Sequence, residues 1–254
     1  MSTIITIAKN TFKETIRDRV LYVILAFAIL LIISTIFFGS ISLDQDAKII
    51  KDLGLAGIFL FGVIIAIFVG TTLVHKEIDK RTVYLIFPKP VYKYEFVLGK
   101  FLGMAATLLL VTVLMSAVFF AILAIKRVSI SIVLIEAIAW GYCELLILSA
   151  ISILFSSLTS PIASTIYTIC LFIIGHASTS LLYLMYTTNS KFLLYLVKGA
   201  YYIFPNFEKF NIRNSAIAGI GISGDQILFT ILYGLAYIII ALMISNYLLK
   251  KQEF

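Results

Sequence analysis

Charged residues and prolines are scarce in this chain. Of its 254 residues, 13% are charged and 61% are hydrophobic, and only four are prolines. With a mean hydropathy of +1.08, the chain is too apolar to fold around one soluble core. We therefore predict a polytopic membrane protein that is all-α.

Cysteine and histidine are also rare, with two of each. Cys143 and Cys170 fall inside apolar runs and match no C-x-x-C spacing, so the sequence indicates neither a disulfide framework nor a thiolate metal site. The H-E-x-x-H, G-x-S-x-G and G-x-x-x-x-G-K-[ST] patterns are missing, since Gly99-Lys100 continues into Phe101. We expect no catalytic residue, no bound cofactor and no metal site in this chain.

The basic residues give a formal net charge of +7, yet they flank apolar runs and do not form a polar face of their own. Charges in such places anchor helix ends at anionic lipid head groups. We expect the lipid bilayer, and no nucleic acid, as the partner of these charges.

Six apolar runs are long enough to cross a hydrocarbon core of roughly 30 Å at about 1.5 Å per residue. Before them, residues 2–19 place apolar side chains at near-helical spacing beside four Lys/Arg, which predicts an amphipathic helix in the membrane interface. We therefore predict a single transmembrane domain over 1–254, with spans at 20–38, 53–74, 101–125, 132–156, 162–184 and 226–249.

Residues 185–225, between the last two predicted spans, contain apolar runs too short to cross a membrane. The two runs are 192–197 and 201–204. Runs of this length are typical of re-entrant or interfacial helices, which we place at the outer face.

The distribution of Lys and Arg predicts the orientation. Short loops rich in these residues stay in the cytoplasm, and the loop 76–100 carries six of them. If both termini are inside, twelve of the twenty Lys/Arg are cytoplasmic. We therefore expect both termini, and the loop 76–100, on the cytoplasmic side.

Three ionisable residues lie within predicted spans: Glu136, Glu144 and His176. A carboxylate at the bilayer centre costs roughly 2.5–3.5 kcal/mol on insertion scales, so it must face protein or water. Glu136 is about one turn from the outer end of its span, where snorkelling to the interface is favoured. Glu144 and His176 lie at about the same depth on antiparallel neighbours, so we expect a hydrogen bond between them; a purely structural pair and contact with a cavity or substrate both stay open.

Glu144 and His176 also support two other classes of function. A membrane-embedded enzyme could use both residues and would act without ATP. A secondary transporter could use Glu144 as a proton or ion site and would depend on an ion gradient, although we find no inverted repeat in its favour.

The loop between the second and third spans carries the strongest pattern. It reads Glu77-x-Asp79-x-x-Thr82, and then Pro90-Val91-Tyr92-Lys93-Tyr94-Glu95-Phe96-Val97-Leu98-Gly99-Lys100. This resembles the corresponding loop of ABC-2 type exporter permeases, roughly E-x-E-x-G-T and then P-V-S-R-x-E-F-x-x-G-K. In this chain Arg81, Tyr92 and Lys93 stand where glycine, serine and arginine are usual.

A second stretch carries a further resemblance. Residues 205–211 read Pro-Asn-Phe-Glu-Lys-Phe-Asn. This is similar to a P-N-x-x-x-F-[ND] stretch in the branch that includes the permeases for multicopper-enzyme maturation and nitrous-oxide reductase assembly.

The resemblance implies a permease subunit of an ABC exporter in a prokaryotic cytoplasmic (inner) membrane, which forms the path and does not itself catalyse. It implies a second permease copy, identical or related, and two separate ATPase subunits that bind ATP and Mg. A short helix in the loop 76–100 would fit a cleft on the ATPase. The residues implied in this coupling are Glu77, Asp79, Pro90, Tyr92, Lys93, Glu95, Phe96, Gly99 and Lys100.

The residues of this loop suggest how such a helix would form. Pro88 and Pro90 lack a backbone donor, so we expect them to end the cytoplasmic extension of the second span. A new helical turn from Val91 would place Tyr92 and Phe96 on one face. Gly99 and Gly103 would let the third span pack closely against a neighbour.

Overall fold

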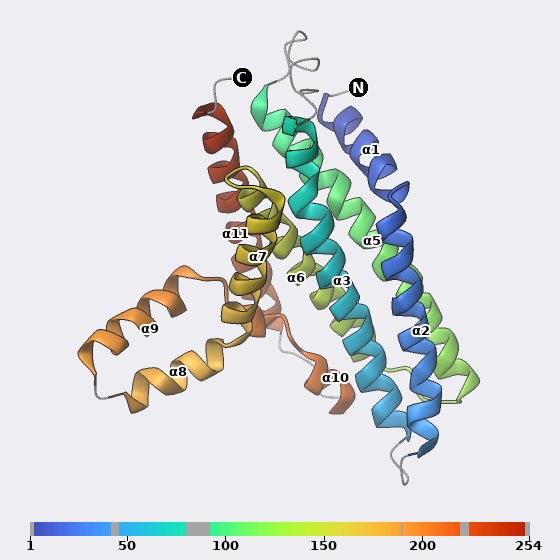
Figure 1. Ribbon diagram of the computed structural model, residues 1–254. Helices are drawn as coiled ribbons and strands as arrows, with labels where there is room; N and C mark the ends of the chain where they lie inside the picture. The colour runs from blue at the N-terminus through green and yellow to red at the C-terminus, as the bar shows by residue number, and fades with distance from the viewer. Residues whose placement is uncertain (1–2, 42–45, 80–91, 189, 219–223, 252–254) are drawn as a thin grey trace.

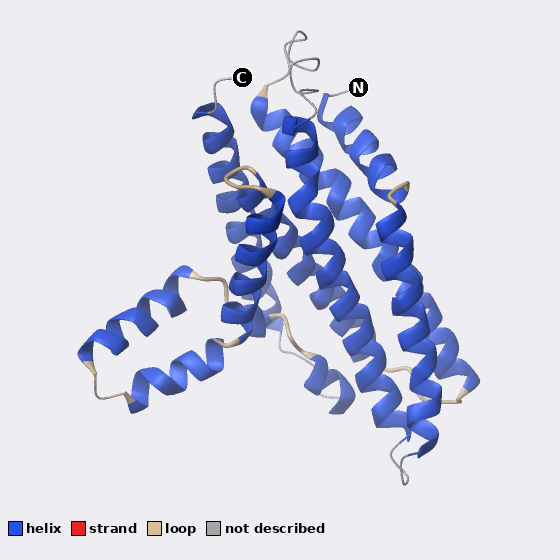
Figure 2. Cartoon of the chain, viewed as in Figure 1, coloured by secondary structure: helices blue, strands red, loops and turns tan. Residues whose placement is uncertain are grey.

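The structure, a computed structural model, describes residues 3–41, 46–79, 92–188, 190–218 and 224–251. These residues form helices joined by turns, as Figure 2 shows. Five helices are long and apolar enough to cross a membrane, or six if one bent pair counts as a single span. The prediction of an all-α membrane protein is confirmed.

The long helices run side by side as a bundle (Figure 1). The first helix begins and the last helix ends at the same end of it, which we call the terminal end. We call the opposite end, where α2 ends and α3 begins, the far end. The elements are α1 (Thr3–Ile16), α2 (Arg19–Ile41), α3 (Asp46–Asp79), α5 (Lys93–Ile125), α6 (Ile132–Ser156), α7 (Pro161–His176), α8 (Ser178–Thr187), α9 (Lys191–Ile203), the short 3-10 helix η1 (Phe207–Lys209), α10 (Arg213–Ala218) and α11 (Gly224–Lys251).

The centre of the bundle is the contact between α3 and α6. The Ser156 hydroxyl donates to the carbonyl of Thr71 (2.6 Å), and the Ser152 hydroxyl reaches the carbonyl of Ala66 (3.2 Å). Small hydroxyl residues allow close approach of two helices and find their partners inside the protein, where lipid offers none. In the membrane-spanning stretches of α3 and α6, 61% and 56% of the residues are buried, against 22% in α2 and 17% in α11. The apolar sides of α2 and α11 are therefore the ones left for lipid or another subunit.

The second predicted span is part of a longer helix. We placed this span at 53–74, but α3 begins at Asp46 and continues to Asp79. Asp46 lies in the first turn, where a carboxylate stabilises the helix N-terminus, and Ile50 is buried in the core. Pro88 and Pro90, which we expected to end this helix, lie outside the described residues.

The third predicted span also starts earlier than expected. We placed its beginning at Phe101, after a separate short helix, but α5 runs without interruption from Lys93 to Ile125. Hydropathy marks where a helix becomes apolar enough for lipid, and charged residues in the preceding turns do not end it. The start of the predicted coupling helix and the third span are thus one rigid element.

The single span expected over 162–184 is broken. The helix α7 ends at His176, α8 begins at Ser178, and their axes differ by 61°. The chain at this point is small and polar, and the Ser178 hydroxyl donates to the carbonyl of Gly175 (2.6 Å). From the bend, α8 and α9 leave the bundle as a hairpin (Figure 1). The two apolar runs expected to form helices within 185–225 belong to one helix, α9, whereas η1 and α10 were not predicted. The depth of α9 in a bilayer stays a prediction.

The amphipathic segment 2–19 forms α1, which lies along the first half of α5 (Figure 1). Thr11 and Thr15 are buried in this contact, whereas Ile5 of the expected apolar stripe is 51% exposed. The other apolar residues of this segment, Ile4, Ala8, Phe12 and Ile16, are partly buried. The location of α1 in the membrane interface stays a prediction.

Candidate functional site

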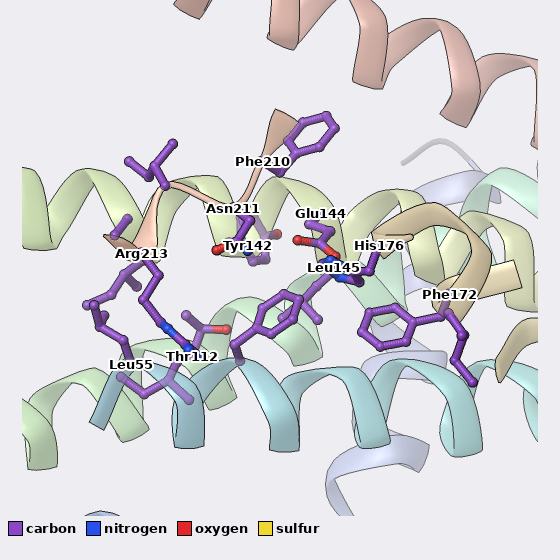
Figure 3. Close-up of a pocket in the computed structure, with 17 residues that line it drawn as sticks. Leu55, Thr112, Tyr142, Glu144, Leu145, Phe172, His176, Phe210, Asn211 and Arg213 are labelled. Atoms are coloured by element: carbon purple, nitrogen blue, oxygen red, sulfur yellow. The ribbon is translucent and has the colours of Figure 1, made fainter. Parts of the chain in front are cut away.

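A cavity of about 410 Å³ lies among α3, α5, α6 and α7, in the half of the bundle nearer the far end. The segment 210–213 completes its wall (Figure 3). Its volume is in the range of small-molecule binding sites. Most of the wall is apolar: Leu55, Ile58, Phe59, Ala137, Ile138, Leu145, Phe172, Ile173, Phe210 and Ile212.

Glu144 and His176 meet in this wall. The Nε2 atom of His176 lies 2.7 Å from Oε1 of Glu144, and the Glu144 side chain is 1% exposed. The expected hydrogen bond between antiparallel helices is therefore present. Both residues also line the cavity, so the pairing and the contact with a cavity occur together (Figure 3).

The second ring nitrogen of His176 faces another carboxylate. Nδ1 lies 3.6 Å from Oε2 of Glu208, in η1. A neutral imidazole donates from one nitrogen, whereas an imidazolium donates from both. The protonated ring is therefore the form that can serve Glu144 and Glu208 at once. The rings of Phe59, Phe172 and Phe207 surround it, with centroids 5.9, 4.6 and 5.8 Å from that of the imidazole.

Two further polar groups of the wall, on Arg213 and Tyr142, are bonded within the protein. Nε of Arg213 lies 2.9 Å from Oδ1 of Asp52, and the Tyr142 hydroxyl donates to the carbonyl of Ala105 on α5 (3.0 Å). Sequence reasoning counted Arg213 only among the outer Lys/Arg and gave Glu208 no role, because a count of charges carries no information on contacts. The one available signal was the stretch 205–211, in which Glu208 lies.

Glu136 lies apart from the other two ionisable residues. It is partly exposed on α6, about two turns before Glu144, and is not in the cavity wall. Its snorkelling to the interface stays a prediction. Among the described residues, no group of three His, Cys, Asp or Glu side chains is placed to hold a metal ion.

The other predicted residues lie at the terminal end, at the start of α5. Tyr92 and Tyr94 are 65% and 45% exposed there, and their rings stack with centroids 5.6 Å apart. Phe96, in contrast, is buried. The prediction that Tyr92 and Phe96 share a face is wrong, because Tyr92 has extended φ and ψ (−72° and 141°) and precedes the helix.

Two charged residues of the motif fix this helix start. The backbone N–H of Tyr92 donates to Oε2 of Glu95 (3.2 Å), which satisfies a donor that the helix leaves open. Nζ of Lys93 donates to the carbonyl of Leu249 (2.8 Å) in the last turn of α11, where a cation is favoured. The start of α5 is thus bound to α11.

The next turns of α5 pack against α1. A Cβ at Gly103 would lie 2.7 Å from the Ala8 carbonyl oxygen, and one at Gly99 would lie 2.6 Å from Ile7, so only glycine allows this approach. Nζ of Lys100, which is 2% exposed, lies 3.7 Å from Oε2 of Glu14. The start of α5 therefore contacts both α1 and α11.

The side-chain contacts of three further motif residues are outside the described part of the chain. Glu77 and Asp79 lie in the last turns of α3, and their side chains are outside the described part of the chain. Pro90 lies outside the described residues. The structure thus brings together Tyr92, Lys93, Glu95, Phe96, Gly99 and Lys100 on one helix end.

A comparison of the chain with curated protein sequences finds no match. The sequence profile of a family described as ABC-2 family transporter protein matches residues 5–254. The match is to the family as a whole, and the resemblance to the branch for multicopper-enzyme maturation stays a prediction. Because the match extends from α1 through α11, this multi-pass membrane protein belongs to the ABC-2 transporter family.

Proposed function

We propose that this chain is the permease subunit of an ATP-driven exporter in a prokaryotic cytoplasmic membrane. It forms the translocation path together with a second permease copy. Two separate ATPase subunits bind ATP and Mg and hydrolyse the ATP. One observation carries the proposal: α5 is a single helix from the exposed Tyr92 and Tyr94 at its start to Thr112 in the cavity wall. A docked ATPase would thus contact the start of α5, and the middle of the same helix lines the cavity.

The contacts at the start of α5 support a role in coupling. Residues 93 and 112 are roughly 28 Å apart along a helix with a rise of about 1.5 Å per residue. The ion pair of Lys100 with Glu14 and the close approach at Gly103 bind this helix to α1. A displacement at Tyr92 would therefore move α1 and α5 together, because packed helices shift as rigid units.

Copurification tests the docking of an ATPase. The full chain, tagged and purified from its native membranes in mild detergent, is expected to bring an ABC ATPase that mass spectrometry identifies. The double variant Tyr92→Ala/Tyr94→Ala should lose most of this subunit, because aromatic side chains dominate docking contacts. Membrane insertion should be unchanged.

The matched control removes two exposed tyrosines from the α8–α9 hairpin, Tyr186 and Tyr195, which are 85% and 72% exposed. This control is expected to retain the ATPase. If both double variants retain it equally, or if no ATPase accompanies the wild type, the proposed docking surface is wrong.

The orientation is tested separately. In a chain whose Cys143 and Cys170 are replaced by serine, a single cysteine at Asn211 should react with a membrane-impermeant maleimide in intact cells, and one at Tyr94 should not. Both positions are exposed in the structure, so accessibility within the protein does not bias the comparison. Labelling at residue 94 and not at residue 211 would place the termini outside the cell, and the proposed orientation would be wrong.

One observation favours secondary transport as a second candidate, namely the buried Glu144 beside His176 and Glu208. Such groups inside a membrane are typical of ion or proton pathways. This function predicts transport that is driven by an ion gradient and persists without an ATPase subunit. Transport that stops when ATP is withdrawn, at constant gradient, would exclude it.

A further inference from the structure

We propose that the cavity bounded by Glu144, His176 and Phe59 binds a monovalent organic cation with an apolar body. As a statement about the transported substrate this rests on the proposed function, but the binding itself does not. Three features carry it: the charge balance of the wall, the position of one carboxylate oxygen and the apolar volume beside it.

The charge balance of the wall favours a cation. Glu144 and Glu208 both face His176, at 2.7 and 3.6 Å. One imidazolium offsets one of these two carboxylates, and Arg213 is already paired with Asp52 at 2.9 Å. The two carboxylates and one imidazolium leave a net negative charge beside the cavity, although Glu208 lies outside the lining and is 42% exposed, so water screens part of its charge.

The position of Glu144 directs this charge into the cavity. Its Oε1 accepts from His176, and Figure 3 shows the other carboxylate oxygen directed away from the imidazole. Among the described residues, the side-chain hydrogen bond of Glu144 is the one that Oε1 makes with His176, and the side chain is 1% exposed. A ligand ammonium is the complement of such a group, because it donates a charge-assisted hydrogen bond.

The other polar groups of the wall offer little to an anion. The Tyr142 hydroxyl donates its proton to the carbonyl of Ala105. The guanidinium of Arg213 is engaged with Asp52. This arrangement disfavours an anionic ligand.

The rest of the wall sets the shape of the ligand. Phe59 and Phe172 contribute aromatic rings, and the volume of about 410 Å³ exceeds what a small inorganic ion would fill. Aromatic faces attract cations and also bury apolar carbon. The ligand class is therefore an amine with an aryl or alkyl body, and not a hydrated metal ion.

Binding is tested with the full chain in lipid nanodiscs, without ATP or any ATPase, using tritiated 4-phenylbutylamine as the probe. Wild type should bind it saturably. The uncharged 4-phenylbutanol and the anionic 4-phenylbutyrate have nearly the same body, and each should compete at least tenfold more weakly. If either competes as well as the unlabelled amine, the cation assignment is overturned.

Two pairs of variants locate the site. Glu144→Gln should weaken binding about tenfold or more, and Glu136→Gln, which removes the same charge from the same helix outside the cavity, should leave it unchanged. Phe59→Ala should weaken binding severalfold, and Phe68→Ala, on the lipid-exposed side of α3, should not. Equal effects within both pairs, or no saturable binding by wild type, would overturn the proposal.

The Phe59 and Phe68 pair decides the question if Glu144→Gln proves unstable in detergent. The result is also separable from the proposed function. Absent binding would leave ATP-driven transport of another substrate intact. Binding in a protein that never associates with an ATPase would refute the exporter and keep the site.

Discussion

The start of α5 and the cavity are both polar places in an apolar bundle, but they are built differently. At the start of α5, Lys93 and Glu95 bind backbone groups, Lys100 pairs with Glu14, and the helices touch through glycine, so that Lys100 is only 2% exposed. In the cavity, two carboxylates share one histidine beside about 410 Å³ of open volume. The contacts at the start of α5 fix helices to one another. The cavity leaves a charge and a space for a ligand.

The difference predicts that substitutions will act differently at the two places. Dense contacts make a region sensitive to added volume, because packed helices cannot yield. An open site tolerates changes in volume and charge with less loss of stability and responds instead in binding. Stability measurements on variants at both places therefore test the comparison.

The largest effect is expected at Gly103. Gly103→Leu would force side-chain atoms against Thr11 and the backbone of Ala8, where a Cβ alone would be 2.6 and 2.7 Å from its neighbours. We expect a loss of about 3 kcal/mol or more, seen as a lower apparent melting temperature in detergent. Gly199→Leu is the control, because a Cβ there meets nothing within 4 Å. Similar melting temperatures for the two variants would contradict the close packing of α1 on α5.

A smaller loss of stability is expected in the cavity. Glu144→Leu removes the acceptor of a hydrogen bond and leaves His176 unsatisfied, at about 1–3 kcal/mol. Glu144→Gln keeps an acceptor oxygen and should assemble normally. Glu136→Leu, in the same helix, should cost nothing measurable. If the hydrogen bond between Glu144 and His176 does not stabilise the protein, the leucine and glutamine variants of Glu144 will be equally stable.

Tyr142 provides a finer test between these two regions, because its hydroxyl joins the cavity wall to α5. Tyr142→Phe deletes its hydrogen bond to Ala105 and little else, and we expect a loss of about 1 kcal/mol. Tyr167→Phe, at an exposed tyrosine of α7, is the control and should be neutral. A neutral result for both would mean that this hydrogen bond does not bind α6 to α5.

The smallest effect is expected from Arg213→Gln. Its ion pair with Asp52 has a short Nε–Oδ1 distance of 2.9 Å, but both side chains are about two-fifths exposed, at 41% and 43%. Water and salt screen such a pair, so we expect a change of about 0–1 kcal/mol that disappears at high ionic strength. A large loss that persists in high salt would show that this pair supports the cavity wall.

The sequence predicted those features that depend on spacing along a helix. The bounds of α6 agree with the prediction because a largely apolar run lies between Ser131 and the polar turn before Pro161. The meeting of Glu144 with His176 followed from equal depth at a fixed rise per residue.

Other features depend on contacts that spacing does not encode. The bend at Ala177 escaped detection because hydropathy averaged over 162–184 hides a short polar stretch. The continuity of α5 was missed because the start of the span was set by hydropathy, which separated it from the helical turn expected from Val91. Glu208 reaches His176 only after α8 and α9 have brought the chain back to the bundle, and no sequence pattern states that return.

The central claim is that α5 connects a docked ATPase to the cavity, and accessibility of Thr112 tests it most directly. In the copurified complex, with Cys143 and Cys170 replaced by serine, a cysteine at Thr112 should react with an impermeant maleimide at a rate that changes severalfold upon addition of ATP and vanadate. Thr112 is 5% exposed in the structure, so opening of the path should raise the rate. The added change Tyr92→Ala/Tyr94→Ala should abolish the response. An identical rate with and without ATP in an intact complex would contradict the account.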